Sequence, residues 1–413
     1  MHILLFAIYT VVLCWALTRV PFFKDIRPAV LIGFFLLRVA AGCAHNWIAW
    51  RYFPHHGDIW LFFDDSLRSR HLLFTDPHRF WEENYAFSHL PHNLIEWTHI
   101  LFNYLSFDNF YINTLFFCFI TFGGFIALFK TFYERFNRDA LSAAAMLLLP
   151  SILFWTSCMH TEGIIFAILG WLFYAMHRSF KKGWKTRRMI ISVLLTALAI
   201  FFRPALAAGL IPALAIWILA EMGPRRRRWL LFFGVLVALV AGIAFIYPQA
   251  FAIIPRTLSA RQQEYQVLAG GSRIYLPVLQ PTWVSFRRVL PDALINGLAE
   301  PLFSFEGQKV YKIFSMELLA VWATVLAAIG IPRKKFTIRP FSIACALLAI
   351  LGMTLVGFII PFVGAIVRYR SIYLPFLLGP SLASFRNLVF FKNINTRLSG
   401  YIFKQVPRQT VVS

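Results

Sequence analysis

The acidic side chains of one long polar loop are the first groups in the chain that could do chemistry. Residues 51–110 hold eight of the eighteen Asp and Glu residues of this 413-residue sequence. Asp58 lies early in the loop, after Gly57 and before an aromatic-rich segment. A carboxylate that is partly desolvated beside an apolar segment has a raised pKa and can act as a general base toward a hydroxyl group. Asp58 is therefore a candidate catalytic base, and the alternative is that it caps the helix that follows.

The same loop offers oxygen and nitrogen ligands for a divalent cation. Carboxylates and imidazoles are common ligands of such ions, and the weak candidates here are Asp64, Asp65, His55 and His56. Their spacing matches no strong metal motif, so we expect a solvated acidic loop, with a divalent cation allowed but not required. No cysteine has CxxC or CxxH spacing, and we interpret all of them as buried free thiols. They are Cys14, Cys43, Cys118, Cys158 and Cys345.

A second acidic candidate, Glu162, lies where two apolar segments meet. It follows the short polar turn 157–161 and begins a new apolar run. An ionisable residue at the end of a membrane helix is a functional candidate by default. A carboxylate also stabilises the start of a helix through the helix dipole. The sequence leaves both roles open for Glu162.

Several arginines lie outside the short clusters that hold most of the basic residues, and four of them are candidates for binding a phosphate. A guanidinium group can bind two oxygens of a phosphate at once, which suits the phosphate of a lipid-phosphate donor. An unpaired charge inside a membrane costs about 2.5–3.5 kcal/mol on insertion scales, so each such arginine needs a compensating partner. The alternatives are an internal salt bridge to Glu162 or Asp58 and contact with lipid headgroups. The four candidates are Arg203, Arg273, Arg368 and Arg370.

The composition indicates that membrane helices position these carboxylates and arginines. The chain is 59% hydrophobic and only 14% charged, and apolar runs recur along its whole length. This pattern predicts an all-α, polytopic transmembrane bundle, whereas a β-barrel would show short alternating segments. The net charge of +22 comes from basic clusters between apolar runs. Such clusters orient a membrane protein with its basic loops inside, so we exclude nucleic-acid binding.

The apolar runs predict about eleven spans within a single domain over residues 1–413, with the N-terminus outside. We expect helices at about residues 3–18, 28–50, 111–129, 140–158, 162–177, 189–203, 204–220, 230–247, 311–331, 341–363 and 371–385. The outer face then receives the loop 51–110, the turn 157–163, the second polar stretch 248–308 and the turn 364–370, which can converge there.

The first loop is expected to hold two helices that lie in the membrane interface. Residues 58–70 have helical character, and residues 81–105 are rich in aromatics suited to that depth. The apolar face of the first helix is expected to consist of Trp60, Leu61, Phe63 and Leu67.

Four short motifs, in this order, resemble those of bacterial integral-membrane glycosyltransferases of the GT-C superfamily. The first two are Gly57-Asp58 before an aromatic-rich helix and a Pro150-to-Glu162 turn that contains Trp155 and Ser157. They are followed by Arg203-Pro204 and by Arg368-Tyr369-Arg370 before a helix with Pro375. The superfamily includes protein O-mannosyltransferases and the lipid A aminoarabinose transferase. The segment 270–301 also resembles uncharacterised members from the Bacteroidetes.

The resemblance implies a sugar transfer from a polyprenyl-phosphate donor to a lipid-linked, glycan or protein acceptor. Asp58 would be the base, Glu162 a second catalytic residue, and the four arginines would hold the donor phosphate. The active site would face the periplasm from a bacterial inner membrane, with membrane lipids around it. The chain departs from the family pattern at Ile59, where many relatives carry a second acidic residue, and at Thr161, where many carry Lys.

Two other functions fit the same composition. An O-antigen polymerase or ligase would use outer-face arginines on a lipid pyrophosphate and would not need Asp58. A lipid-linked sugar flippase or transporter is disfavoured because the sequence shows no pair of Gly/Pro-broken helices in its two halves.

Overall fold

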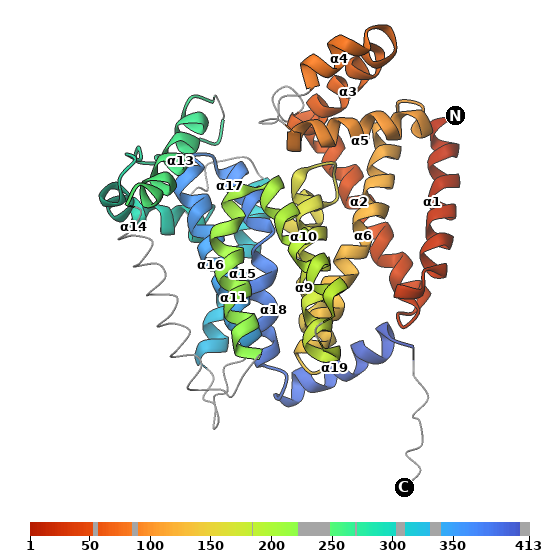
Figure 1. Ribbon diagram of the computed structural model, residues 1–413. Coiled ribbons are helices and arrows are strands. Elements are labelled where there is room, and N and C mark those ends of the chain that lie inside the picture. Colours follow the sequence, from red (N-terminus) through yellow and green to blue (C-terminus); the bar gives the residue numbers. More distant parts are fainter. Residues whose placement is uncertain are drawn as a thin grey trace. The chain divides into compact units, whose positions relative to one another are not determined.

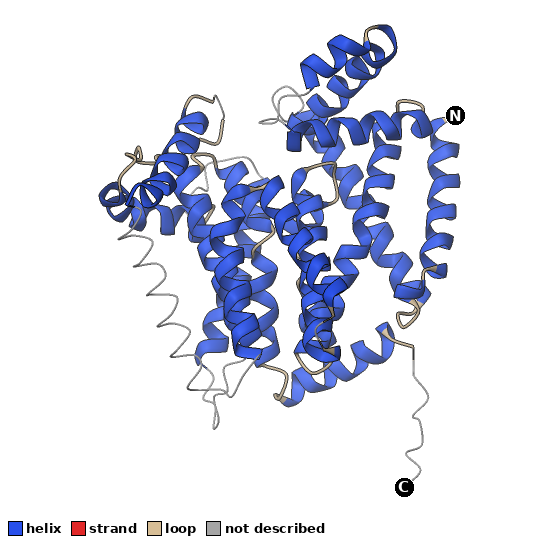
Figure 2. Ribbon diagram, viewed as in Figure 1, coloured by secondary structure: helices blue, strands red, loops and turns tan. Residues whose placement is uncertain are grey.

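The chain is helical throughout the part that the structure describes. A computed structural model describes residues 1–52, 57–84, 90–183, 185–221, 248–268, 271–302, 310–330 and 340–404, and within these ranges it contains helices and two isolated β-bridges (Figures 1 and 2). The prediction of an all-α fold is confirmed. The sequence predicts one domain, whereas the chain packs as two compact units, residues 1–202 with 383–413 and residues 203–382.

The first unit is built on parallel and antiparallel apolar helices with shorter helices across both ends (Figure 1). Its long helices are α1 (His2–Arg19), α2 (Pro28–Tyr52), α6 (Phe110–Arg135), α9 (Thr161–Lys182) and α10 (Thr186–Phe202). At one end lie α3 (Gly57–Thr75), α4 (Pro77–Asn84) and α5 (Leu90–Ser106), and at the other lies α19 (Val389–Ile402). Two short helices, α7 (Ala140–Ala145) and α8 (Pro150–Thr156), complete the described part of this unit.

The second unit centres on α16 (Pro340–Ile359), which packs against both α11 (Ala207–Glu221) and α14 (Trp283–Ala299). A short 3-10 turn, η4 (Pro204–Leu206), leads into α11. The unit also contains α13 (Pro248–Gln266), α15 (Val310–Gly330), α17 (Val363–Ser371) and most of α18 (Leu374–Ser384).

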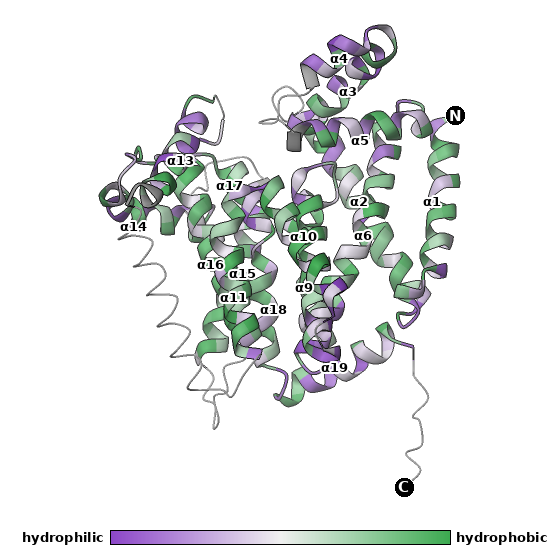
Figure 3. Cartoon of the chain, viewed as in Figure 1, coloured by the Kyte–Doolittle hydropathy of each residue, from purple (hydrophilic) through white to green (hydrophobic). Residues whose placement is uncertain are grey.

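The long helices have the length and hydropathy of membrane spans (Figure 3). Among the described residues, seven helices could cross a membrane, or eight if the bent pair α18 and α19 forms one span. The protein is therefore a helical membrane protein. The expected count of about eleven is not confirmed: the helix at 230–247 lies outside the described residues, and α10 is only 17 residues long.

Three expected elements were wrong, and proline explains the first two. The expected helix over 140–158 is two short helices, α7 and α8, because Pro150 occupies the first turn of α8 and Leu149 before it is extended. The expected helix over 341–363 ends at Ile359, just before Pro361. The turn expected at 364–370 is instead the helix α17.

Glycines allow α6 and α9 to pack with their backbones in contact. A Cβ atom added at Gly170 would overlap the carbonyl oxygen of Gly124, and one added at Gly124 would overlap Ala167. Small residues at such positions are a common way for membrane helices to approach closely, because apolar lipid gives little hydrophobic driving force between them.

We expect Gly170→Ala to destabilise the protein by about 1–3 kcal/mol, because the added methyl group forces two packed backbones apart. Thermal unfolding in detergent, followed by circular dichroism, measures this. Gly33→Ala is the matched control: Gly33 also lies in an apolar helix, and nothing lies within 4 Å of the added Cβ. Equal melting temperatures for the two variants would contradict this account of the α6–α9 contact.

Candidate functional site

A buried break in the chain separates α8 from α9. Its four residues, 157–160, are all buried, and His160 has an extended backbone with φ −129° and ψ 157°. The last carbonyl groups of a helix have no partner within the helix. Water cannot supply one inside a membrane bundle, where each unsatisfied group costs several kcal/mol. The surrounding helices must therefore supply the donors.

Arg38 of α2 supplies one of these donors. Its guanidinium group is completely buried and donates to the carbonyl oxygen of Thr156 at 2.8 Å. It also donates to Thr121 Oγ1 at 3.3 Å and to the carbonyl oxygen of Cys118 at 3.5 Å, and its Cζ lies 3.5 Å from the centroid of the Phe125 ring. One buried arginine thus joins α2, α6 and the end of α8.

Two further side chains donate to carbonyl groups at the break. His45 Nδ1 lies 2.9 Å from the carbonyl oxygen of Phe154, and Cys118 Sγ lies 3.1 Å from that of Ser157. Because a carbonyl oxygen can only accept, His45 carries a proton on Nδ1. A Cβ atom added at Gly42 would lie 2.5 Å from the Ser157 oxygen, so glycine lets α2 approach the break this closely.

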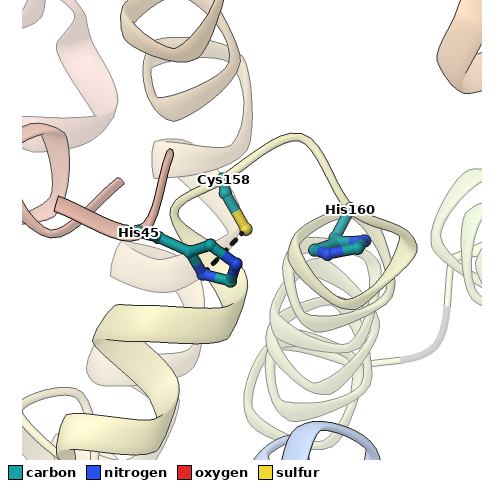
Figure 4. Close-up of side chains that lie close together, drawn as sticks. All are labelled: His45, Cys158 and His160. Carbon is teal, nitrogen blue, oxygen red and sulfur yellow. Dashed lines mark hydrogen bonds between the residues drawn. The ribbon is translucent and has the colours of Figure 1, made fainter. Parts of the chain in front are cut away.

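The break also brings together two histidines and a thiol, from α2 and from the turn itself (Figure 4). One potential ligand atom from each of His45, Cys158 and His160 lies within 4.8 Å of the others, and all three residues are buried. Cys158 Sγ is 3.4 Å from His45 Nδ1. Glu162 follows in the first turn of α9; it is completely buried, and its Oε2 lies 3.9 Å from His160 Nδ1.

The first-loop helix α3 packs directly on this break. Ile59 and Phe63 share a buried apolar cluster with Cys158, and the ring of Phe62 lies edge-on to His160 with centroids 6.3 Å apart. The first loop and the turn after α8, which the sequence predicts on one face, therefore meet in the first unit. The apolar face of α3 differs from the expectation: Leu61 is 52% exposed, whereas Ile59 and Phe62, which were not expected on this face, are buried.

The acidic candidates lie on both sides of this contact. Asp58 is exposed in the first turn of α3, one residue before the buried Ile59. Glu162 is buried in the first turn of α9. Among the weak metal candidates, Asp64 is exposed and Asp65 is half-buried, whereas His55 and His56 lie outside the described residues. Asp58 as the base stays a prediction.

A buried polar network anchors the helices of the first loop to α6. Asn103 Nδ2 donates to Ser66 Oγ at 3.0 Å, and Asn113 Nδ2 donates to Asn103 Oδ1 at 2.6 Å. Asn113 Nδ2 also lies 3.1 Å from His99 Nδ1. Burial lowers the pKa of His99 to about 3, so this imidazole is neutral and accepts through Nδ1. These hydrogen bonds fix the positions of α3, α5 and α6 relative to one another.

In the second unit, two predicted arginines meet on one tyrosine ring. The Cζ atoms of Arg203 and Arg368 lie 4.2 and 4.7 Å from the ring centroid of Tyr369. Arg368 also donates to Tyr369 Oη at 2.8 Å, and Tyr265 Oη lies 3.0 Å from the same oxygen. Cation–π contacts of this kind hold a guanidinium in place, so one tyrosine ring gathers both arginine side chains.

The other two predicted arginines contact different groups. Arg273 is exposed, donates to Gln266 Oε1 at 2.8 Å and lies over the ring of Phe362. Arg370 is buried, donates to the backbone oxygen of Glu300 and lies close enough to Glu300 and Glu317 for their charges to stabilise it. These contacts favour a structural role for Arg370.

Sequence reasoning missed His45 and the ligand character of Cys158. The local signals were two cysteine–histidine pairs two positions apart, Cys43 with His45 and Cys158 with His160, which are weak patterns. His45 lies in an apolar helix more than a hundred residues away in the chain. Only the folded bundle brings its imidazole to the turn.

No protein-family model, curated protein or solved structure matches this chain. The resemblance to GT-C enzymes therefore stays a prediction, and the function has to be argued from the side chains.

We expect Arg38→Met to lower the stability of the protein by about 1–3 kcal/mol, because the Thr156 carbonyl loses a buried donor while the apolar packing is largely kept. Thermal unfolding in detergent checks this. Arg51→Met is the control, since Arg51 is exposed at the end of the same helix. An Arg38→Met variant that melts with the wild type would show that this donor does not hold the break.

Proposed function

We propose that the protein is a multi-pass membrane glycosyltransferase that uses a polyprenyl-phosphate-linked sugar. The observation that carries the proposal is the pair of guanidinium groups, from Arg203 and Arg368, held on the ring of Tyr369. An anion with several oxygens can accept hydrogen bonds from two guanidinium groups at once, and a phosphate is such an anion.

The place of this pair along the chain favours a lipid phosphate over a soluble one. Arg203 directly precedes the candidate membrane span Pro204–Glu221, and Arg368 lies on α17, which follows the span Pro340–Ile359. A phosphate at the end of membrane helices is at the depth of a lipid headgroup. The polyprenyl tail would then remain in the bilayer.

In the proposed reaction Asp58 is the base and Glu162 a supporting carboxylate. The Asp58 carboxylate accepts the proton of the acceptor hydroxyl, and that oxygen forms a bond to the anomeric carbon. The bond from the anomeric carbon to the phosphate oxygen breaks, and the polyprenyl phosphate leaves with the electron pair. The configuration at the anomeric carbon inverts. The exposed position of Asp58 at the start of α3 suits an acceptor that arrives from water.

The proposal places the protein in a bacterial inner membrane, with about eleven spans and its site toward the periplasm. The distribution of charge in the first unit supports this orientation. α6 and α9 end in Arg135 and in Lys181 and Lys182, whereas α6 begins directly after the first loop. Basic residues favour the cytoplasmic side. The acceptor is a lipid-linked sugar, a glycan or a protein, and the reaction itself requires no cofactor.

We expect Asp58→Asn to lower the rate of sugar transfer by about 100-fold or more, because general-base catalysis contributes 10²–10⁴-fold. Purified protein in proteoliposomes, supplied with radiolabelled polyprenyl-phosphate sugars and a panel of hydroxyl acceptors, measures this. Transfer at the wild-type rate in the variant would move the chemistry away from the first loop and favour a polymerase or ligase. Transbilayer movement of the donor without transfer would favour a flippase.

We expect Arg203→Ala and Arg368→Ala each to weaken donor binding about 10-fold or more, because a hydrogen bond to a charged group contributes about 1.5–3 kcal/mol. Binding of a radiolabelled polyprenyl phosphate to the protein in nanodiscs checks this without turnover. Arg397→Ala, an exposed arginine of α19, is the control. Unchanged binding in both test variants would remove the phosphate role of this pair.

A further inference from the structure

We propose that His45, Cys158 and His160 form a binding site for one transition-metal ion, with Zn²⁺ the ion to expect. The three residues come from α2 and from the buried turn between α8 and α9, and their potential ligand atoms lie within 4.8 Å of one another (Figure 4). None of the three ligands takes part in the proposed transfer chemistry, and the site is also separate from the acidic loop where the sequence suggested a cation.

The donor set selects the class of metal. A thiolate with two imidazoles suits Zn²⁺ or another borderline-soft transition metal. Mg²⁺ and Ca²⁺ prefer oxygen ligands. The side chains of His45, Cys158 and His160 offer nitrogen and sulfur instead. The site therefore differs in chemistry from one built on Asp64 and Asp65.

The neighbouring hydrogen bond prepares His45 for this role. Its Nδ1 donates to the carbonyl oxygen of Phe154 at 2.9 Å, so the neutral ring carries its lone pair on Nε2. Histidines that bind metals commonly donate their other ring N–H to a backbone carbonyl or a carboxylate, which fixes the tautomer and orients the ring. The carbonyl group of Phe154, in the last turn of α8, supplies this second interaction.

The buried carboxylate beside the cluster completes the balance of charge. Glu162 is completely buried, and its Oε2 lies 3.9 Å from His160 Nδ1. A carboxylate and a thiolate are expensive to bury as anions, and a divalent cation between them offsets both charges. Three protein ligands also leave a fourth tetrahedral position, which Glu162 or a water molecule can occupy.

A metal bound by these three residues would join the turn between α8 and α9 to α2. The break otherwise depends on hydrogen bonds to its carbonyl groups, and α3 packs on its outer side through Ile59 and Phe63. We assign the ion a structural role, because all three ligands are buried.

The test is the metal content of the full-length chain, purified in detergent with an affinity tag that contains no histidine. The protein is incubated with Zn²⁺, freed of excess metal and measured by mass spectrometry of the element. We expect about one ion per chain, and its loss in Cys158→Ser and in His45→Gln. Cys345→Ser and His71→Gln, which alter a cysteine and a histidine elsewhere, should keep the ion.

Cobalt substitution tests the identity of the ligands without any variant. Wild-type protein loaded with Co²⁺ should show a thiolate-to-cobalt charge-transfer band and the visible bands of a tetrahedral ion. A wild-type chain that retains no metal, or one that binds cobalt without the thiolate band, overturns the proposal even if the variants do not fold. Loss of the metal in the double variant His55→Gln/His56→Gln but not in Cys158→Ser would place the ion in the first loop and would also overturn it.

Discussion

The carbonyl groups at the end of α8 must find hydrogen-bond donors without water, and the arrangement of the first unit depends on this requirement. The chain stops its helix inside a membrane bundle, where each unpaired carbonyl is costly. The donors come from two other helices: Arg38 and His45 belong to α2, and Cys118 belongs to α6. The register and rotation of both helices relative to the break are thereby constrained.

The break between α8 and α9 is also the surface on which the first-loop helix α3 packs. Because the turn is held firmly, its Cys158 side chain presents a stable apolar contact to Ile59 and Phe63. The network through Asn103 and Asn113 secures α3 from the other side. The helix α3, at whose exposed start Asp58 lies, is therefore held by contacts on two sides.

In the second unit, two arginine side chains are positioned by contact with one tyrosine ring. Tyr369 receives two guanidinium groups and a hydroxyl group, from Arg203, Arg368 and Tyr265. Arg370, two residues after Arg368, is instead buried, where it donates to the backbone oxygen of Glu300. Adjacent arginines in one motif thus have different environments, because successive positions on a helix point in different directions.

The sequence by itself determined the all-α membrane character and the helix that begins near Asp58, since hydropathy and periodicity act over short stretches. It misplaced the break before Pro150, which appeared as part of one apolar run. Tertiary structure alone decided that His45 meets Cys158 and that Arg203 meets Arg368. Both pairs join positions far apart in the chain, and their contact depends on how helices rotate and pack against one another, which no local pattern records.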